Sequence, residues 1–353
     1  MKAVLLAAGK GKRLRPATEA RPKPLLPIAG STLFEYNLSV ISDFPNVYVV
    51  VSYGKELFQE LADGYGFTPV DQGEPMGTGH AVLKLGEVTR DDLLLIYSDI
   101  YLPPGTREKI LSYTDRYDHV VAVTPVDRPW EFGVVELEDG LLKRIVEKPP
   151  KGEEPSNLII AGAFFLSQTI FDHVREVGPS PRGEIELTDA LTRAAKEGER
   201  IGVVEISPWV DAGRPDDFLR AQKLLLDDVI EGKRSPPKGY RIEGDLLISG
   251  DVDLSNSEVS GPSALGECLL AKSKVGPYSY LEHHSEITHC VVSNSIIMRR
   301  SKLSFSSIES SLITDGSVII TSDLRRVVTA PSVRVEGCSL SEEKLWENKF
   351  CPT

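Results

Sequence analysis

The sequence has few cysteines. Its 353 residues contain only four, which are Cys268, Cys290, Cys338 and Cys351. No CxxC pair and no histidine cluster accompany them, which argues against a zinc site. We therefore expect all four to be small buried hydrophobic residues of a protein in a reducing compartment.

Long apolar runs and excess positive charge are also missing. No run approaches the ~18 apolar residues of a membrane span, and the N-terminal run ends at Gly9, too early for a secretory signal. We expect a cytoplasmic protein with no membrane partner. Lys and Arg number 40 against 52 Asp and Glu, a net charge of -12. This balance argues against nucleic-acid binding, which needs a basic surface, but allows a local basic pocket for a small phosphorylated ligand.

Apolar strands alternate with helical segments as far as residue 230. This alternation is typical of βαβ units and predicts a doubly wound, mostly parallel α/β sheet. The pair Asp139-Gly140 between two apolar runs predicts a hairpin. The expected strands are 2–8, 47–52, 66–71, 93–97, 119–124, 132–137, 141–147, 158–166 and 201–206, and the expected helices are 33–41, 55–62, 79–85, 185–196 and 215–230.

The pattern changes after a segment rich in proline, glycine and charge, which predicts a domain boundary. From about residue 240 to 320 an aliphatic residue recurs every five to seven positions, with Ser, Asn and Gly between. This repeat indicates a left-handed parallel β-helix of hexapeptide type, the alternative being an irregular β domain. We expect a catalytic domain over 1–232, a linker over 233–239, a β-helix over 240–338 and a tail over 339–353 that caps the last coil as a short helix.

The loop after the first strand is rich in glycine and basic residues. Gly9 and Gly11 let the backbone approach a phosphate, and successive N–H groups can form an anion-binding nest. Lys12 and Arg13 add positive charge. Lys23 follows between prolines that stiffen the backbone and is suited to a second phosphate. The spacing matches neither the P-loop nor the dinucleotide fingerprint, so a tight turn and a solvated surface lysine are the alternatives.

Other candidate ligand-binding residues follow predicted strands. The amide of Gln72 offers a donor and an acceptor to a pyrimidine edge, and Gly77 leaves room for a flat base. Asp99 ends an apolar strand, where ligands bind in open α/β sheets. Asp211 lies in a turn before the last helix of the domain. Magnesium needs only one or two protein carboxylates besides phosphates and water. The alternatives are a glycine-rich helix entry for the segment of Gln72 and Gly77, and a turn or helix-entry aspartate for Asp99 and Asp211.

The order of the motifs is more specific than any one of them. The chain reads LAAGxGxRLxP, KPLLP, QxxxxGT, SD, FGVV, EKP, GEIELTDA and WxDAG, over residues 1 to about 230. This series resembles the sugar-phosphate nucleotidyltransferase superfamily, which includes glucose-1-phosphate thymidylyltransferases and the uridylyltransferases for glucose 1-phosphate and N-acetylglucosamine 1-phosphate. Several branches carry a C-terminal β-helix, and 294–298 with 308–313 is similar to the long thymidylyltransferase form.

The resemblance implies a Rossmann-like fold, Mg2+ as cofactor and a role for each matching residue. Lys12, where many relatives have Thr, and Ser98, where many have Gly, depart from the pattern. The implied catalytic residues are Arg13, Lys23 and Lys148, and the implied metal ligands are Asp99 and Asp211. The implied nucleotide-binding residues are Ala8, Gly9, Gly11, Lys12, Arg13, Gln72, Gly77 and Thr78. The implied sugar-phosphate-binding residues are Lys23, Gly133, Glu147, Lys148, Asn157 and Gly162.

The expected reaction is transfer of a nucleoside monophosphate to a sugar 1-phosphate, with release of pyrophosphate. The sequence favours dTTP with glucose 1-phosphate, and UTP with glucose 1-phosphate or N-acetylglucosamine 1-phosphate is the alternative, since one methyl group is weakly discriminated. Acetyl transfer in the β-helix and a non-catalytic regulatory role are further alternatives. We also expect a homo-oligomer.

Overall fold

The computed structural model describes residues 1–352 and divides them into two compact units. The sheet unit consists of Met1–Gly9 and Asn37–Trp209, and the β-helix unit consists of Lys10–Tyr36 and the chain from Val210 onward. Each unit combines two separate parts of the sequence, whereas the expected boundary at 233–239 divides the chain into continuous domains. That boundary therefore stays a prediction.

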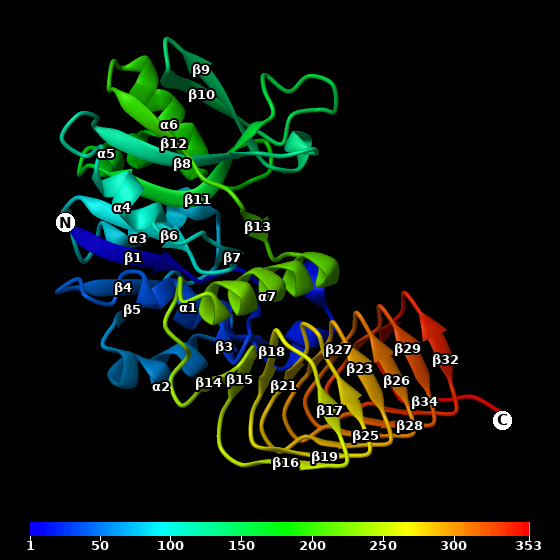
Figure 1. Ribbon diagram of the computed structural model, residues 1–353. Coiled ribbons are helices and arrows are strands. Elements are labelled where there is room, and N and C mark those ends of the chain that lie inside the picture. The colour runs from blue at the N-terminus through cyan, green and yellow to red at the C-terminus, as the bar shows by residue number, and fades with distance from the viewer. Residues whose placement is uncertain (353) are drawn as a thin grey trace. The chain divides into compact units, whose positions relative to one another are not determined.

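The sheet unit is built on nine strands in the order β10-β9-β11-β6-β1-β4-β5, with β8 joined to β11 and β12 (Figure 1). Strands β6, β1, β4 and β5 are parallel, whereas β11 runs antiparallel to its neighbours. The predicted mostly parallel α/β fold is confirmed. The nine strands are β1 Lys2–Leu6, β4 Val47–Val51, β5 Thr68–Asp71, β6 Leu93–Tyr97, β8 His119–Pro125, β9 Gly133–Glu138, β10 Leu141–Glu147, β11 Leu158–Leu166 and β12 Ile201–Glu205. The short strand β7 Ile100–Tyr101 does not belong to this sheet.

The helices of the sheet unit are α2 Lys55–Tyr65, α3 Thr78–Leu85, α4 Thr106–Leu111, α5 Ile170–Glu176 and α6 Leu187–Lys196, and α1 Leu33–Ser39 straddles the two units. Helices α1, α2, α3 and α6 fall where the sequence predicts them, whereas α4 and α5 lie outside the expected helical ranges. Leu85 of α3, Phe171 of α5 and Leu191 of α6 are fully or almost fully buried in one cluster with Val4 and Leu95 of the sheet. Burial of this apolar surface is the main stabilising contribution to the unit.

The hairpin predicted at Asp139-Gly140 joins β9 and β10. Glu138 pairs with Leu141, and both turn residues have positive φ, 51° and 79°. This conformation is the one that asparagine, aspartate and glycine tolerate best in two-residue hairpins. The hairpin ends at Glu147, and it thereby delivers the predicted EKP motif to a fixed place on the sheet.

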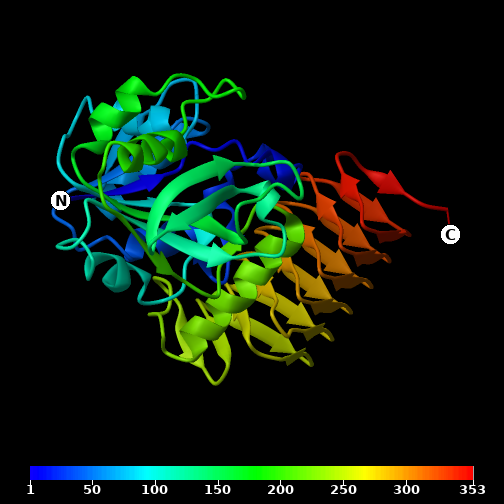
Figure 2. The same ribbon diagram turned by 90° about the horizontal axis from the view of Figure 1, so that it is seen from above.

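The β-helix unit contains three sheets wound as a left-handed β-helix, as predicted (Figures 1 and 2). Their strands are parallel except the first, Arg241–Glu243, which runs antiparallel to Leu246–Ile248. The first sheet is β14 Arg241–Glu243, β15 Leu246–Ile248, β18 Ser263–Leu265, β21 Tyr280–Leu281, β24 Ile296–Ile297, β27 Leu312–Ile313, β30 Val328–Thr329 and β33 Lys344–Leu345. The second is β16 Val252–Ser255, β19 Cys268–Ala271, β22 Glu286–Thr288, β25 Lys302–Ser304, β28 Val318–Ile320, β31 Arg334–Glu336 and β34 Lys349–Phe350. The third is β17 Glu258–Val259, β20 Lys274–Val275, β23 Val291–Ser293, β26 Ser307–Glu309, β29 Asp323–Arg325 and β32 Ser339–Ser341.

Buried serines at the corners of the β-helix explain the small polar residues in the repeat. The amide of Ser279 donates to Ser263 Oγ at 3.2 Å and that of Ser311 to Ser295 Oγ at 3.0 Å, each pair being 16 residues apart. One coil thus takes 16 residues, which is shorter than three complete hexapeptides. Because a buried backbone N–H needs a partner, the serine hydroxyl of one coil satisfies the amide of the next.

The rest of the β-helix unit packs against both early and late coils. It comprises the short strands β2 Pro27–Ile28, β3 Ser31–Thr32 and β13 Val210–Asp211, the 3-10 turns η1 Lys12–Leu14, η2 Ala17–Glu19 and η3 Lys23–Leu25, and helix α7 Pro215–Ile230. Gln222 of α7 is fully buried; its Nε2 donates to Tyr278 O at 2.9 Å, and its Oε1 accepts from Ala29 N at 3.4 Å. Helix α7 therefore links the 10–36 segment to the coils.

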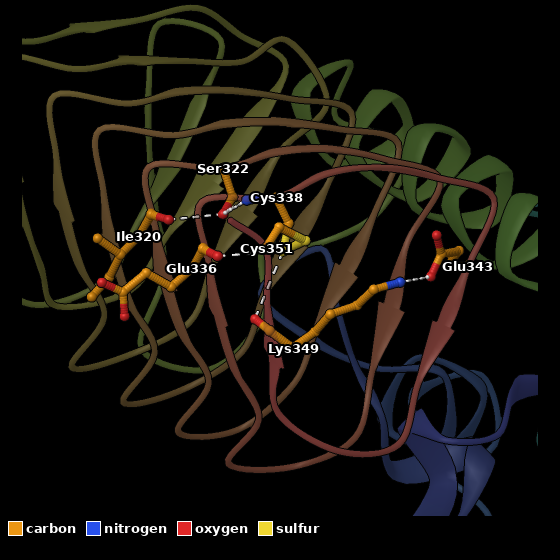
Figure 3. Close-up of a disulfide and its surroundings, with 7 residues drawn as sticks. All are labelled: Ile320, Ser322, Glu336, Cys338, Glu343, Lys349 and Cys351. Atoms are coloured by element: carbon orange, nitrogen blue, oxygen red, sulfur yellow. Dashed lines mark hydrogen bonds and ion pairs between the residues drawn. A yellow bond between two sulfur atoms is a disulfide. The ribbon is translucent and has the colours of Figure 1, made fainter. Parts of the chain in front are cut away.

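The short helix expected in the tail is wrong, because β32, β33 and β34 continue the coils through this region. The expectation of four unpaired cysteines is wrong for two of them. Cys338 and Cys351 form a disulfide, with Cα atoms 5.0 Å apart (Figure 3). Pairing of β34 with β31 brings Cys351 beside Cys338, and the amide of Cys351 donates to Glu336 O at 3.0 Å. Cys268 and Cys290 are free and buried, as predicted.

Between residues 1 and 352, no helix has both the length and the apolar content needed to cross a bilayer.

Candidate active site

The candidate site residues divide between the two units. The β-helix unit carries the basic loop and one predicted metal ligand, and the sheet unit carries the other metal ligand and most residues predicted to bind base and sugar. In the β-helix unit these residues are Gly11, Lys12, Arg13, Lys23 and Asp211. In the sheet unit they are Ala8, Gly9, Gln72, Gly77, Thr78, Asp99, Gly133, Glu147, Lys148, Asn157 and Gly162.

In the β-helix unit, Asp211 lies between two of the predicted phosphate-binding cations. Its Oδ2 is 2.7 Å from Arg13 Nη2, and its Oδ1 is 3.0 Å from Lys23 Nζ. Burial of the carboxyl opposes ionisation, but the charges of Lys23 and Arg13 outweigh it and hold the pKa of Asp211 below its usual value. The three side chains therefore form a charged cluster in which two cations contact one carboxylate.

Lys23 is held at this cluster by its own backbone. It begins the 3-10 turn η3, with Pro22 before it and Pro24 after it, and the lysine is only 4% exposed. A proline fixes φ near -65°, which restricts the backbone on both sides. A charged residue this buried is rare without a partner, and Asp211 provides one.

Two glycines make room for the cations. Gly11 has a φ of 59°, and a Cβ there would lie 2.8 Å from Lys23 Cβ. A Cβ at Gly213 would lie 2.3 Å from Arg13 Nη2. The role of Gly213 was not predicted, although it ends the WxDAG motif. Lys12, by contrast, is exposed in the 3-10 turn that also contains Arg13.

In the sheet unit, the predicted base-binding segment is tied to the GEIELTD segment. The amide of Gly79 donates to Ile185 O at 2.8 Å, and that of Leu187 donates to Thr78 Oγ1 at 3.1 Å. A Cβ at Gly77 would lie 2.4 Å from Ile185 O. Close packing of two chain segments therefore already requires this glycine, while its contact with a base stays a prediction.

Gln72 is almost fully buried, at 2% exposed. Its Nε2 donates to Gly77 O at 2.9 Å and lies 3.3 Å from Nδ1 of His80. This amide therefore fixes the glycine-rich turn in the structure. Burial of the imidazole lowers the pKa of His80, which favours the neutral ring beside the amide.

Three carboxylates surround Arg182, and of these only Glu147 is a predicted site residue. Arg182 Nη1 lies 3.0 Å from Glu147 Oε1 and 3.3 Å from Glu186 Oε1, and Nη2 lies 3.4 Å from Glu184 Oε2. Lys148 Nζ is 3.8 Å from Glu147 Oε1, and Lys148 has a φ of 46°, which is uncommon outside glycine. Glu184 and Glu186 belong to the GEIELTD motif, which is the sequence signal for this cluster but indicates no role for either residue.

Burial and mutual repulsion shift the titration of these acids. Burial raises the pKa of Glu147 in spite of Lys148 and Arg182. Burial of Glu186, followed by the charges of Glu147 and Glu184, raises its pKa well above the usual range. One arginine thus faces more negative charge than it neutralises.

The remaining predicted residues of the sheet unit are placed around β6, β9 and β11. A Cβ at Gly133 would lie 2.9 Å from Glu147 Oε2, and one at Gly162, with a φ of 73°, would lie 2.7 Å from the ring of Tyr97. Asn157 is exposed just before β11, Ala8 and Gly9 follow β1, and Asp99 follows β6. Ser98 is buried with its hydroxyl donating to Leu6 O at 2.7 Å, so this departure from the family pattern joins the ends of β6 and β1.

No group of three metal-binding side chains occurs within residues 1–352. Of the predicted residues, the structure brings together Arg13, Lys23 and Asp211 in one unit and Glu147 and Lys148 in the other. Asp99 and Asp211 belong to different units.

Comparison with known proteins identifies the family. The profile described as "Nucleotidyl transferase" matches residues 2–228. The bifunctional protein GlmU of Methanococcus maripaludis is 38% identical over 262 residues, which are 73% of this chain and 61% of that protein. The chain thus spans about three fifths of such relatives. The low-salt glycan biosynthesis nucleotidyltransferase Agl11 of Haloferax volcanii is 32% identical, over 92% of this chain and 95% of that protein.

Solved structures agree with this assignment. A putative glucose-1-phosphate thymidylyltransferase from Bacillus anthracis matches with a TM-score of 0.57 and 27% identity, over 64% of this chain and 95% of that one. A UDP-glucose pyrophosphorylase complexed with UDP-glucose matches with a TM-score of 0.57 and 25% identity, over 64% of this chain and 98% of that one. The chain therefore belongs to the nucleotidyl transferase family.

Proposed function

We propose that this chain transfers a uridylyl group from UTP to a sugar 1-phosphate, with N-acetylglucosamine 1-phosphate or glucose 1-phosphate as acceptor. The observation that carries the proposal is the cluster of Arg13, Lys23 and Asp211, with atoms 2.7 and 3.0 Å apart. These two cations, held on rigid backbone, supply positive charge and hydrogen-bond donors of the kind that bind phosphate groups. The family assignment supports the same reaction type.

The choice of UTP departs from the pair favoured by the sequence, dTTP with glucose 1-phosphate. The relatives by sequence include GlmU, and the structural relatives include a UDP-glucose pyrophosphorylase in complex with UDP-glucose. The Bacillus anthracis relative keeps dTTP as the second candidate. The two bases differ by one methyl group, for which a pocket discriminates by only about 1–3 kcal/mol.

In the proposed reaction, an oxygen of the sugar phosphate attacks the α-phosphorus in line and pyrophosphate leaves. The nucleophile is already an anion, so no general base is required, and the protein contributes positioning and charge stabilisation. Arg13 and Lys23 bind the triphosphate, and Lys148 binds the phosphate of the sugar. Glu147, with Gly133, Asn157 and Gly162, orients the sugar, and Gln72, Gly77 and Thr78 bind the base.

Asp99 and Asp211 are the proposed ligands of Mg2+, which would neutralise phosphate charge when bound. The chemistry of Asp211 fits this role, because an ionised carboxylate is a preferred magnesium ligand and the pKa of Asp211 is lowered by its cationic neighbours in spite of its burial. Both of its oxygens accept from Arg13 and Lys23, so we expect these two cations to turn toward the phosphates when substrate binds.

The test is pyrophosphate release by the purified protein, with UTP, dTTP, CTP, ATP and GTP each combined with several sugar 1-phosphates. We expect the fastest release with UTP and one of the two named sugars. Faster release with dTTP would overturn the choice of nucleotide, and no release with any pair would overturn the reaction type.

A relative from Sulfurisphaera tokodaii is named a bifunctional sugar-1-phosphate nucleotidylyltransferase/acetyltransferase, so acetyl transfer is tested in the same preparation with acetyl-coenzyme A and glucosamine 1-phosphate. Histidine is the residue such a step would use as base, and Nδ1 of His283 already accepts from Glu267 N at 3.1 Å. We therefore expect no acetyl transfer. Self-association of the chain stays a prediction, to be measured by sedimentation.

A further inference from the structure

Arg21, two residues before the catalytic lysine, is bound to the coils of the β-helix. Its Nε lies 3.1 Å from Asp315 Oδ2, its Nη2 2.5 Å from Asp315 Oδ1, and its Nη1 3.5 Å from Glu282 Oε1. All three side chains are largely buried, at 15%, 20% and 13% exposed. Such a two-pronged arginine–carboxylate contact fixes orientation as well as distance.

The two carboxylates come from different coils. Glu282 follows β21 and Asp315 follows β27, and β24 lies between these strands in the first sheet. The amide of Arg299, from the intervening coil, donates to Glu282 Oε2 at 2.9 Å. Arg21 is therefore anchored to a rigid ladder of paired strands and not to a single mobile side chain.

Little freedom separates this anchor from the cluster at Asp211. Pro22 lies between Arg21 and Lys23, Pro24 follows, and Lys23 Nζ is 3.0 Å from Asp211 Oδ1. A second contact holds the other end of the loop, because Lys344 Nζ of β33 donates to Arg13 O at 2.9 Å. The coils therefore hold the basic loop on both sides of its two catalytic cations.

We infer that Arg21 is a positioning residue, through which Asp315 and Glu282 of the β-helix hold Lys23 and Arg13 in the geometry needed for catalysis. The inference rests on the proposed function for its kinetic consequence. It gives the β-helix a role in the nucleotidyl transfer itself, without any ligand of its own.

Steady-state kinetics test the consequence. Arg21→Met removes the charge and keeps an unbranched side chain, and Asp315→Asn removes the partner charge. We expect kcat to fall about 10- to 100-fold in each variant, because small displacements of positioned groups have effects of that size. The double variant should be no worse than Arg21→Met, since the two residues act as one unit. If Arg21→Met folds poorly because Asp315 has lost its partner, the double variant serves as a second test, since it also removes the charge of Asp315.

Arg299→Met is the matched control. Arg299 Nε lies 3.7 Å from Asp315 Oδ2 but its side chain is 53% exposed, and it makes no contact with the 10–36 segment among the interactions of the described residues. We expect wild-type kcat and KM in this variant. A loss in Arg299→Met equal to that in Arg21→Met would overturn the inference, because the effect would then be one of general charge near Asp315.

Hydrogen exchange tests the anchor without substrate. The amides of Leu14, Leu25 and Leu26 donate to Gly11 O, Pro22 O and Lys23 O in the two 3-10 turns of the loop. We expect these amides to exchange at least about tenfold faster in Arg21→Met and Asp315→Asn than in wild type and Arg299→Met, well below the melting temperature.

Only faster exchange together with reduced kcat supports the inference. Unchanged exchange, or faster exchange with wild-type kcat, overturns it, as does a lower melting temperature with both measurements unchanged. If wild type itself releases no pyrophosphate, the proposed function fails, and the exchange experiment still decides whether Arg21 anchors the loop.

Discussion

The two charged clusters of the molecule use similar residues in opposite proportions. In the β-helix unit, Arg13 and Lys23 share one carboxylate, Asp211; in the sheet unit, Arg182 is shared by Glu147, Glu184 and Glu186. Burial opposes ionisation of the acids in both places. The pKa of Asp211 is nevertheless lowered, whereas those of Glu147 and Glu186 are raised.

The difference shows that burial raises the pKa of a carboxyl unless neighbouring cations outweigh it, as Lys23 and Arg13 do at Asp211. At Asp211 the two cations keep the carboxylate ionised, and the same cations are the proposed ligands of the triphosphate. A cluster with excess anions binds protons near neutral pH and is suited to hydroxyl groups, which both donate and accept hydrogen bonds. The proposed triphosphate and sugar subsites follow this division.

The largest expected effect is at the cationic cluster. Lys23→Ala or Arg13→Ala should reduce kcat at least about 100-fold, because removing one fixed charge-stabilising donor has that effect in other enzymes. Pyrophosphate release measures it, and circular dichroism checks the fold. Lys12→Ala is the control, since Lys12 is exposed in the same 3-10 turn as Arg13; we expect a smaller loss. Near-normal turnover in either of the first two variants would remove that residue from the mechanism.

The anionic cluster should make stability depend on pH in the opposite sense to an ordinary ion pair. The pKa of Glu186 is raised from 4.5 to about 7, so stability falls as pH rises through this window, where the unfolded chain has released a proton that the folded chain retains. Glu186→Gln removes this dependence. We expect the variant to be more stable than wild type by about 2 kcal/mol at pH 8, with little difference below pH 4.5.

Urea unfolding of both proteins across this pH range measures the difference. Glu184→Gln is the matched control, because Glu184 lies on the same arginine but is 42% exposed. It should change stability by less than about 0.5 kcal/mol. If the difference in unfolding free energy between wild type and Glu186→Gln is the same at pH 5 and pH 8, the excess of anions has no energetic consequence.

A smaller effect is expected at Asp211. In Asp211→Asn the magnesium concentration for half-maximal activity should rise at least about tenfold, the lower end of what altered metal sites show. A magnesium titration measures it, with Glu184→Gln again as control. An unchanged titration would leave Asp211 as the partner of Arg13 and Lys23 only.

Much of this molecule follows directly from the sequence. Continuous apolar runs such as 93–97 become buried strands, and Asp139-Gly140 forms the hairpin, because their local preferences agree with the sheet that surrounds them. The repeat of one aliphatic residue per face likewise fixes the β-helix. The strands at 339–350 were not predicted, because charged and aromatic residues interrupt the pattern of the earlier coils there.

The residues of the candidate site, too, could be predicted from the sequence only in part. The motif order indicated Arg13, Lys23 and Asp211, and the structure brings them into contact. Arg182 directly precedes the GEIELTDA motif and Glu186 lies within it, and no sequence pattern distinguishes either residue. Spacing alone does not determine which cysteines pair, and the disulfide depends on the return of β34 to β31.

The sequence by itself thus determined the fold class, the family pattern and which residues carry charge. Only the tertiary structure decided which charges meet: that Asp211 has two cations, that Arg182 has three acids, and that Arg21 reaches Asp315, 294 residues away. The physical reason is that local propensity acts over a few residues, whereas electrostatic balance is a sum over neighbours that only the folded chain brings within a few ångströms.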